Sequence, residues 1–510
     1  MGASNSIYRL IKSLTINERR YFKIYTSAYK GKKENIYINL FEAIDKQKTV
    51  YDEDKLKRKN KGASFIKNLP VQKNHLYNLI MESLGSYYAE NSIKNILRKC
   101  ITQAEILFEK GMFEEYKKLV AKAKKISIQR EEYLYLLEII NLENKLIQRG
   151  QSTENLKKKG NEEHRVLETI SEYYHYKNLN YLVFGFSSDP TIRNTKQIDW
   201  VTNFLNNTLL VKVPQSDSVL TKILYYQSCG LCYYLLNNQD KSYEYLKKRE
   251  DLFNDPFVVE TYFHYYVTFL QNKIVWEANN KKYEDEFATL IKYKSLLDHK
   301  FIANRLNFKV HIYFSYHTSL IRLFFELGEF NKGAAVIESM QKEIETSKKL
   351  VSKILWSDIC IYSANIFFGI NNFKKAFSFL REIIDKSESG YRDNMVCYAK
   401  ILSLIFNYKL ENHDLLPYQI ASTYRFLLKR NGIFKYELCL IHFLRKETPR
   451  IYSRHDSIIA FKKLKQQIED ICKDPLEAKA LEYFDILSWL KSEIENRPFA
   501  EVIKEKANNK

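Results

Sequence analysis

The sequence predicts an all-α protein in which a long array of helix hairpins follows an N-terminal helical bundle. Three observations support this prediction. Gly accounts for 14 and Pro for 8 of the 510 residues, against average usage of about 7% and 5%, so turn-rich β folds are disfavoured. Hydrophobic residues make up 45% of the chain, which argues against disorder. Apolar residues recur at three- and four-residue spacing along most of the chain, which is the period of an amphipathic helix.

Residues 1–90 are predicted to form a basic bundle of four helices. Thr15 and Glu18 have the spacing of a capping box, which places the start of the first helix beside Thr15. The predicted helices cover residues 14–29, 34–47, 52–69 and 70–90.

Residues 65–80 have the loose spacing of a helix-turn-helix, with a turn at residues 69–71. A second helix that reads DNA would expose its polar residues. These residues are Gln72, Lys73, Asn74, His75 and Asn78. Two interpretations of the bundle stay open: it caps the helical array, or it contacts nucleic acid.

Residues 91–450 are predicted to form the array. Helical periodicity continues through this region, and the interruptions are short and polar. The predicted turns are Asn237–Asn238, Asn279–Asn280, Gly328, Asn371–Asn372 and Glu411–Asn412. Helices joined by short turns at a regular interval indicate an internal repeat.

Four segments of the array share one pattern: 107–123, 233–248, 323–340 and 366–383. Each ends an apolar helix, turns through Gly or Asn, and places an aromatic or polar residue two positions later. A small residue follows three positions on and a large apolar residue four after that. In the two best copies these residues are Gly328, Phe330, Gly333 and Ile337, and Asn371, Phe373, Ala376 and Leu380. The small residue lets the two helices approach closely, because it leaves little side chain between them.

This pattern resembles the tetratricopeptide family of helix–turn–helix repeats, and residues 225–248 fit it best, with Gly230, Tyr233 and Ser242 in place. The later turn positions 239, 283, 330 and 373 are 44, 47 and 43 residues apart, longer than the usual roughly 34. The resemblance implies a right-handed α-solenoid of TPR-like helix hairpins that binds a peptide in a concave groove. The groove residues it implies are Gln227, Leu231, Tyr234, Thr318, Arg322, Phe325, Asp358, Asn365 and Phe368.

Residues 451–510 are predicted to close the array. Asp474 followed by Pro475 is typical of a helix start, and Leu481, Phe484 and Leu487 continue as an apolar stripe. We expect a packing helix here and a frayed tail over residues 504–510.

The net charge is +20, and it is concentrated at the N-terminal end. Residues 1–130 contain 27 Lys and Arg against 13 Asp and Glu, whereas the other 380 residues contain 54 against 48. Codon bias in an AT-rich genome, which enriches Lys, is one explanation of the excess and stays open beside an acidic partner. Codon bias should act on the whole chain, whereas the excess lies at one end. The excess favours an acidic partner such as nucleic acid. The candidate phosphate contacts are Arg19, Arg20, Lys57, Arg58, Lys59 and Lys73.

The sequence predicts no enzyme, no metal site and no cofactor. It contains no HExxH, no GxSxG and no complete P-loop. The pair Cys229 and Cys232 forms a CxxC in the middle of a predicted helix, and no second pair exists to complete a zinc site. We therefore expect these thiols to pack in a core, and the seven scattered cysteines together with the absence of a long apolar run predict a reducing, cytoplasmic location.

These observations predict a non-catalytic scaffold that binds a protein or peptide. The alternative is a nucleic-acid-associated regulator, in which the basic N-terminal bundle contacts phosphates and the array senses a partner. Binding of residues 1–130 to DNA as a function of salt separates the two.

Overall fold

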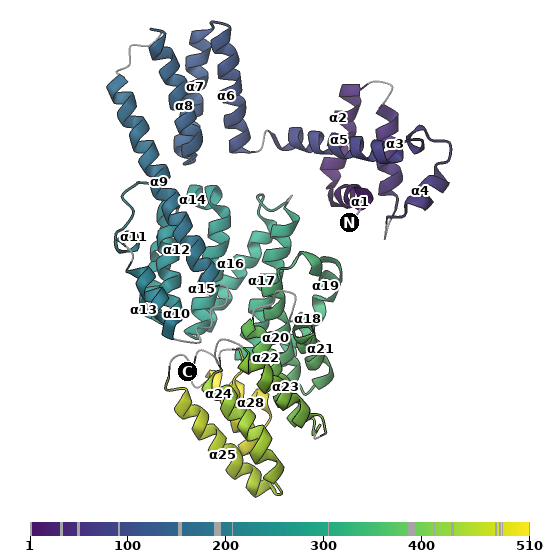
Figure 1. Ribbon diagram of the computed structural model, residues 1–510, viewed down its shortest axis with the longest axis vertical. Helices are drawn as coiled ribbons and strands as arrows, with labels where there is room; N and C mark the ends of the chain where they lie inside the picture. The colour runs from purple at the N-terminus through teal and green to yellow at the C-terminus, as the bar shows by residue number, and fades with distance from the viewer. Residues whose placement is uncertain are drawn as a thin grey trace. The chain divides into compact units, whose positions relative to one another are not determined.

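The computed structural model (Figure 1) describes residues 3–30, 34–47, 51–89, 92–150, 156–187, 195–206, 208–303, 305–385, 393–412, 414–429, 433–474, 477–478, 481 and 483–508. Every regular element among these residues is helical, and none of them forms a strand. The chain divides into two compact units, Met1–Ile170 and Ser171–Lys510, whereas the sequence predicted boundaries at residues 90 and 450. None of the helices in the described ranges combines the length and apolar character needed to cross a membrane.

The first unit begins with five helices that share one apolar core, in which the rings of Phe22 and Phe41 lie 4.9 Å apart. The predicted capping box is confirmed: Glu18 Oε2 accepts from Thr15 N at 2.6 Å, and Glu18 N donates to Thr15 Oγ1 at 3.3 Å. The helices are α1 (Ala3–Ser13), α2 (Ile16–Lys30), α3 (Glu34–Asp45), α4 (Glu53–Lys59) and α5 (Leu69–Ala89).

Two predictions for this bundle are corrected. Helix α1 was not predicted, although it supplies buried Ile7 and Ile11 to the core. The expected helix over 52–69 ends at Lys59, and only a single 3₁₀ turn, Ser64–Ile66, precedes α5. Residues 65–80 therefore contain one α-helix instead of two, because α5 already begins at Leu69.

The rest of the first unit consists of helices joined by tight turns. Tyr116 is fully buried, and its hydroxyl donates to the carbonyl oxygen of Leu142 at 2.7 Å, which links two of these helices. The helices are α6 (Ile93–Glu109), α7 (Phe113–Gln129) and α8 (Tyr133–Gln148), followed by α9 (Leu156–Ser187), which contains the boundary between the units.

In the second unit, neighbouring helices along the chain pack against each other (Figure 1). The first of them are α10 (Thr195–Leu205), α11 (Thr208–Val211), α12 (Val219–Leu235), α13 (Gln239–Leu252), α14 (Pro256–Thr261), α15 (Phe263–Asn279) and α16 (Tyr283–Ser295). Next come α17 (Leu306–Glu326), α18 (Phe330–Ser339), α19 (Gln341–Ser347), α20 (Lys353–Gly369), α21 (Phe373–Ile384), α22 (Asp393–Lys409) and α23 (Leu416–Leu428). The last are α24 (Lys435–His442), α25 (Arg454–Ile471), α27 (Ile486–Glu495) and α28 (Phe499–Asn508).

One turn geometry recurs at seven helix ends within the described residues. At the end of α17, Gly328 N donates to Phe325 O at 3.1 Å and Glu329 N donates to Phe324 O at 2.8 Å. This pair of bonds is a Schellman motif, which satisfies the last carbonyls of a helix through one residue with positive φ. The same bonds recur at every position in the series, whose positive-φ residues are Gly111, Glu131, Asn237, Lys281, Gly328, Asn371 and Glu411.

Most of the predicted turns are confirmed by these backbone angles. Asn237, Gly328, Asn371 and Glu411 have positive φ as expected. The turn predicted at Asn279–Asn280 is displaced, because Lys281 takes the positive φ of 57°.

The C-terminal segment differs from its prediction. The predicted helix start at Pro475 lies outside the described residues and stays a prediction. Helix α27 begins at Ile486 and is capped by Asp485 Oδ1, which accepts from Ser488 N at 3.0 Å. Residues 504–508, predicted to be frayed, belong to α28. This helix forms because its apolar residues Phe499, Val502 and Ile503 are buried against the second unit.

Candidate functional site

Helices α12 and α13 form a closely packed hairpin. Ser218 Oγ caps α12 by accepting from Thr221 N at 3.1 Å, and Asn238 Oδ1 caps α13 by accepting from Lys241 N at 3.1 Å. Ser242 Oγ donates to the carbonyl oxygen of Gly230 at 3.1 Å across the hairpin. The small residues at these two positions therefore let the two helix backbones approach, as the repeat pattern predicted.

A cavity of about 100 Å³ lies between α12, α13 and α15. Trp276 forms part of its wall and is held by stacking on Tyr243, with ring centroids 4.0 Å apart, and by donating Nε1 to Gln239 O at 3.3 Å. The lining residues are Tyr226, Gln227, Gly230, Leu231, Tyr234, Ser242, Leu246, Arg249, Asn272, Val275 and Trp276.

Arg249 gives this cavity its main charge. Its side chain is almost completely enclosed, with 2% of the residue exposed, and its Nη2 donates to Gln227 Oε1 at 3.1 Å. Its Nε is buried and has no hydrogen-bond partner among the described residues, and no carboxylate forms an ion pair with it there. Burial lowers the pKa of Arg249 to about 9, so the guanidinium still carries its positive charge at neutral pH.

A second arginine in the same unit, Arg322, has a side chain that is 12% exposed, and it has a carboxylate partner. Arg322 Nη2 lies 2.8 Å from Oε1 of Glu286, whose side chain is fully buried. The same nitrogen also donates to the carbonyl oxygen of Ile274 at 3.4 Å. Arg322 therefore has its counter-charge within the fold. Arg249 has no carboxylate among the described residues: its guanidinium contacts the Gln227 amide oxygen and lies over the Phe269 ring, with Cζ 5.6 Å from the ring centroid.

The nine groove residues predicted from the sequence are placed in different environments. Gln227, Leu231 and Tyr234 line the cavity together. Thr318 is buried and its hydroxyl donates to Phe314 O at 2.7 Å, and Arg322 is held in its ion pair. These last two positions serve the packing of α17 and do not present free side chains.

Of the four positions predicted nearer the C-terminus, three are buried and one is half-buried. Phe325, Asn365 and Phe368 are buried, because the C-terminal helices cover them. Phe368 lies 5.6 Å from Phe484 and 5.8 Å from Phe499 between ring centroids, and Asn365 Nδ2 donates to the carbonyl oxygen of Tyr483. Asp358 is half-buried on α20.

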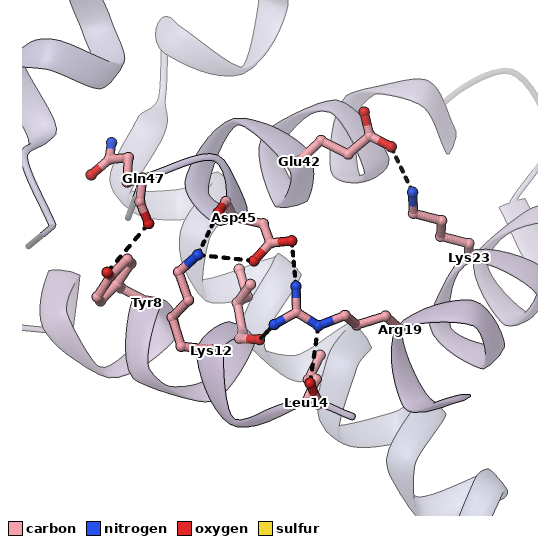
Figure 2. Close-up of polar contacts among 9 residues, drawn as sticks. Tyr8, Lys12, Leu14, Arg19, Lys23, Glu42, Asp45 and Gln47 are labelled. Atoms are coloured by element: carbon pink, nitrogen blue, oxygen red, sulfur yellow. Dashed lines mark hydrogen bonds and ion pairs between the residues drawn. The ribbon is translucent and has the colours of Figure 1, made fainter. Parts of the chain in front are cut away.

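The residues predicted to contact nucleic acid fall into two groups. The guanidinium of Arg19 makes its contacts within the bundle. It pairs with Asp45 and donates to the carbonyl oxygens of Leu14 and Ile11, each at 2.9 Å (Figure 2). Lys73 is also buried and lies 2.6 Å from Glu53. The other four predicted cations are exposed, namely Arg20, Lys57, Arg58 and Lys59.

The CxxC pair packs in the core as predicted. Cys229 and Cys232 are buried as free thiols, and burial raises the pKa of Cys229 to about 12. No group of three metal-ligating side chains occurs in the part of the chain that the structure describes.

Sequence reasoning did not place Tyr226, Arg249, Asn272 and Trp276 in a binding site, although they line the cavity. A signal for Arg249 was present, because Ser242, Leu246 and Arg249 follow helical spacing and so share the packed face of α13. Comparisons with protein-family models, with curated proteins and with solved structures give no match, so the interpretation of this site rests on its own geometry.

Proposed function

We propose that the chain is a non-catalytic binding protein built from TPR-like helix hairpins in a right-handed α-solenoid. The recurrence of one Schellman turn supports this proposal, because the positive-φ residues Asn237, Lys281, Gly328, Asn371 and Glu411 follow each other at intervals of 44, 47, 43 and 40 residues. A similar spacing with the same hydrogen bonds is what a helical repeat produces.

The ligand site in this proposal is the cavity between α12, α13 and α15, and the ligand is a protein or peptide segment. The observation that carries the proposal is that Gln227, Leu231 and Tyr234, which the resemblance to the tetratricopeptide family implied as groove residues, line one cavity. Its volume of about 100 Å³ is below the roughly 300–1,000 Å³ of sites for whole small molecules. It suits one side chain that an extended or helical segment inserts.

Site-specific photo-crosslinking in the cells that make the protein tests this function. A photoreactive phenylalanine analogue replaces Tyr234, and in a control protein it replaces Tyr418, which is 78% exposed on α23. We expect one crosslinked polypeptide from position 234, absent from position 418 and lost when Leu231→Glu fills the cavity with a charge. Crosslinks of the same pattern from both positions, or insensitive to Leu231→Glu, contradict the proposal.

A second candidate function, contact with nucleic acid, is favoured by one observation in the first unit. Residues 55–81 contain seven Lys and Arg and no Asp or Glu. Six of these cations are exposed: Lys55, Lys57, Arg58, Lys59, Lys61 and Lys67. Lys57 pairs with Glu53 at 3.0 Å. The excess of exposed cations in this segment attracts phosphates.

Binding of the full chain to mixed-sequence duplex DNA across a salt series tests this candidate. The triple substitution Lys57→Gln, Arg58→Gln and Lys59→Gln is expected to reduce the slope of log affinity against log salt by about 0.9 for each phosphate contact removed. The matched control replaces three cations of α25, Lys462, Lys463 and Lys465, with Gln. Equal slopes for the two triple variants contradict a specific role for residues 57–59.

A further inference from the structure

The starting observation is a buried positive charge without a counter-charge. Arg249 is 2% exposed, and among the described residues its guanidinium has one hydrogen bond, to the neutral Gln227 amide oxygen at 3.1 Å. A guanidinium carries five N–H donors, and a buried charge without a partner is costly to keep in a folded protein. Arg322 in the same unit, whose side chain is 12% exposed, has Glu286 Oε1 at 2.8 Å. Arg249 is more deeply buried and has no carboxylate partner in the described part of the chain; besides Gln227 it contacts the face of the Phe269 ring, 5.6 Å from Cζ to the centroid.

The second observation is that Arg249 lines an open space. Its buried Nε has no hydrogen-bond partner in the described structure, and the cavity beside it measures about 100 Å³. Asn272 lines the same cavity and makes no hydrogen bond to the described residues through its side chain. Leu246 and Trp276 form an apolar wall of the cavity. Unused N–H donors and a positive charge beside an apolar wall together make a site that favours an anion.

We infer that the cavity between α12, α13 and α15 is an oxyanion site, in which Arg249 binds a carboxylate or phosphate group of a ligand. The planar guanidinium fork matches the two oxygens of either group. The volume of about 100 Å³ admits a compact anionic group. This inference names the chemistry of the group that the proposed partner inserts, and it rests on the proposed function for the source of that group.

Binding of defined anions to the full chain tests the inference. The probes are inorganic phosphate, acetate, and the capped amino acid N-acetyl-aspartate N-methylamide, each titrated at constant ionic strength with chloride as the balancing anion. The readouts are the fluorescence of Trp276, identified by its loss in Trp276→Phe, and the unfolding temperature, which a ligand of the folded state raises.

We expect a saturable response in the wild-type chain and a dissociation constant at least about tenfold weaker in Arg249→Met, because this substitution keeps the length of the side chain and removes its charge. The matched control is Lys247→Met, which removes an exposed cation from the same helix and leaves the response unchanged. If Arg249→Met does not fold, Arg249→Lys serves instead, and a weaker response is expected because the fork is lost.

The probes separate the two sources of the anion. A response to phosphate or acetate that depends on Arg249 assigns the site to free oxyanions, and a response to the capped aspartate alone assigns it to an acidic side chain of a peptide. A further readout is the stability of the anion-free protein, in which Arg249→Met is expected to unfold at the same temperature as the wild type or higher.

Two results overturn the inference: no response to any probe, or a response of full strength in Arg249→Met. The inference and the proposed function can fail separately. If anions bind but no polypeptide crosslinks at position 234, the proposed peptide ligand is wrong and the oxyanion site stands. If a polypeptide crosslinks at position 234 but no anion binds, the oxyanion site is wrong and the peptide ligand stands.

Discussion

The backbone of Gly328 lies directly against that of Ala500, although 172 residues separate them in the chain. A Cβ atom placed on Gly328 would come within 2.8 Å of the carbonyl oxygen of Ala500 and within 2.8 Å of the backbone nitrogen of Lys504. The same turn is tied to α28 by the ion pair between Glu329 and Lys504 at 3.2 Å. The turn between α17 and α18 is therefore also the docking site of the C-terminal helix.

This contact predicts that Gly328→Ala releases α28. Gly328 has a φ of +70°, which costs an L-residue about 1–2 kcal/mol, and the added methyl group also meets backbone atoms that have no side-chain freedom to move. We expect the amides of α28 to exchange hydrogen faster in this variant, because the helix opens locally at lower cost.

Gly111→Ala is the matched control for this prediction. Gly111 has a similar φ of +72°, but nothing lies within 4 Å of the position of its Cβ. The control is expected to lose only the stability that the positive φ costs an alanine at its own turn. Hydrogen exchange in α28 is expected to stay unchanged. If Gly328→Ala affects exchange no more widely than Gly111→Ala does, α28 is not docked on this turn.

Local signals in the sequence predicted much of this fold. The capping box of Thr15 and Glu18 and the positive φ at Asn237 and Asn371 depend on residues close in the chain, so their patterns are visible in the sequence. The burial of Phe368 was not predictable in this way, because the rings of Phe484 and Phe499 that cover it follow more than 100 residues later.

The cavity was partly predictable for the same reason. The repeat pattern identified Gln227, Leu231 and Tyr234, which lie on one face of one helix. It did not reveal that Arg249 lacks a carboxylate, because the absence of a partner depends on every helix that packs around it. A sequence shows which charges exist, whereas their pairing is a property of the tertiary structure.

Glu277 is expected to make the stability of the second unit fall as pH rises. This residue is 3% exposed and accepts from Thr289 Oγ1 at 3.1 Å, while its Oε2 is buried without a partner among the described residues. Burial raises the pKa of Glu277 to about 7 from an ordinary 4.5. Between these two values the folded state binds a proton that the unfolded state has released, so stability decreases from about pH 4.5 to pH 7.

Denaturant unfolding at pH 5 and pH 8 checks this prediction. Glu277→Gln keeps the shape of the side chain and cannot ionise. Its free energy of unfolding is therefore expected to fall less between pH 5 and pH 8 than that of the wild type, and the difference between the two falls is at most about 3 kcal/mol. Glu244→Gln is the control, because Glu244 is exposed and pairs only with Lys248 on the surface. Parallel pH profiles for the wild type and Glu277→Gln would show that this carboxyl group is not protonated in the folded protein.

Substitution of Arg19 is expected to destabilise the N-terminal bundle, whereas substitution of its neighbour Arg20 is expected to leave the bundle intact. Partial burial raises the pKa of Asp45, but hydrogen bonds from Arg19 and Lys12 lower it by more, so the net shift is downward. The contacts of Asp45 with these two cations therefore stabilise the folded state above the ordinary pKa of an aspartate, and this stabilisation is lost as the pH falls. Arg19→Met is expected to destabilise the bundle by about 1–3 kcal/mol, since hydrogen bonds between charged groups are lost.

Arg20→Met is the matched control, because Arg20 is exposed on the same helix. It is expected to leave hydrogen exchange in α2 and α3 unchanged and, if the basic surface binds DNA, to weaken that binding. Faster exchange in Arg20→Met than in Arg19→Met would contradict the ion-pair network of Figure 2 as the support of the bundle.

The CxxC pair is expected to resist thiol reagents until the protein unfolds. Burial raises the pKa of Cys229 to about 12, so only about one in ten thousand of these thiols is ionised at pH 8, and the thiolate is the reactive form. Burial also raises the pKa of Cys232. Cys439 and Cys472 are only half-buried, so a maleimide is expected to modify these two first. Mass spectrometry of peptides after timed labelling, with and without denaturant, gives the order. Rapid modification of Cys229, or a disulfide between Cys229 and Cys232 in the folded chain, would mean that the hairpin opens at this point and that the pair has a chemical role beyond packing.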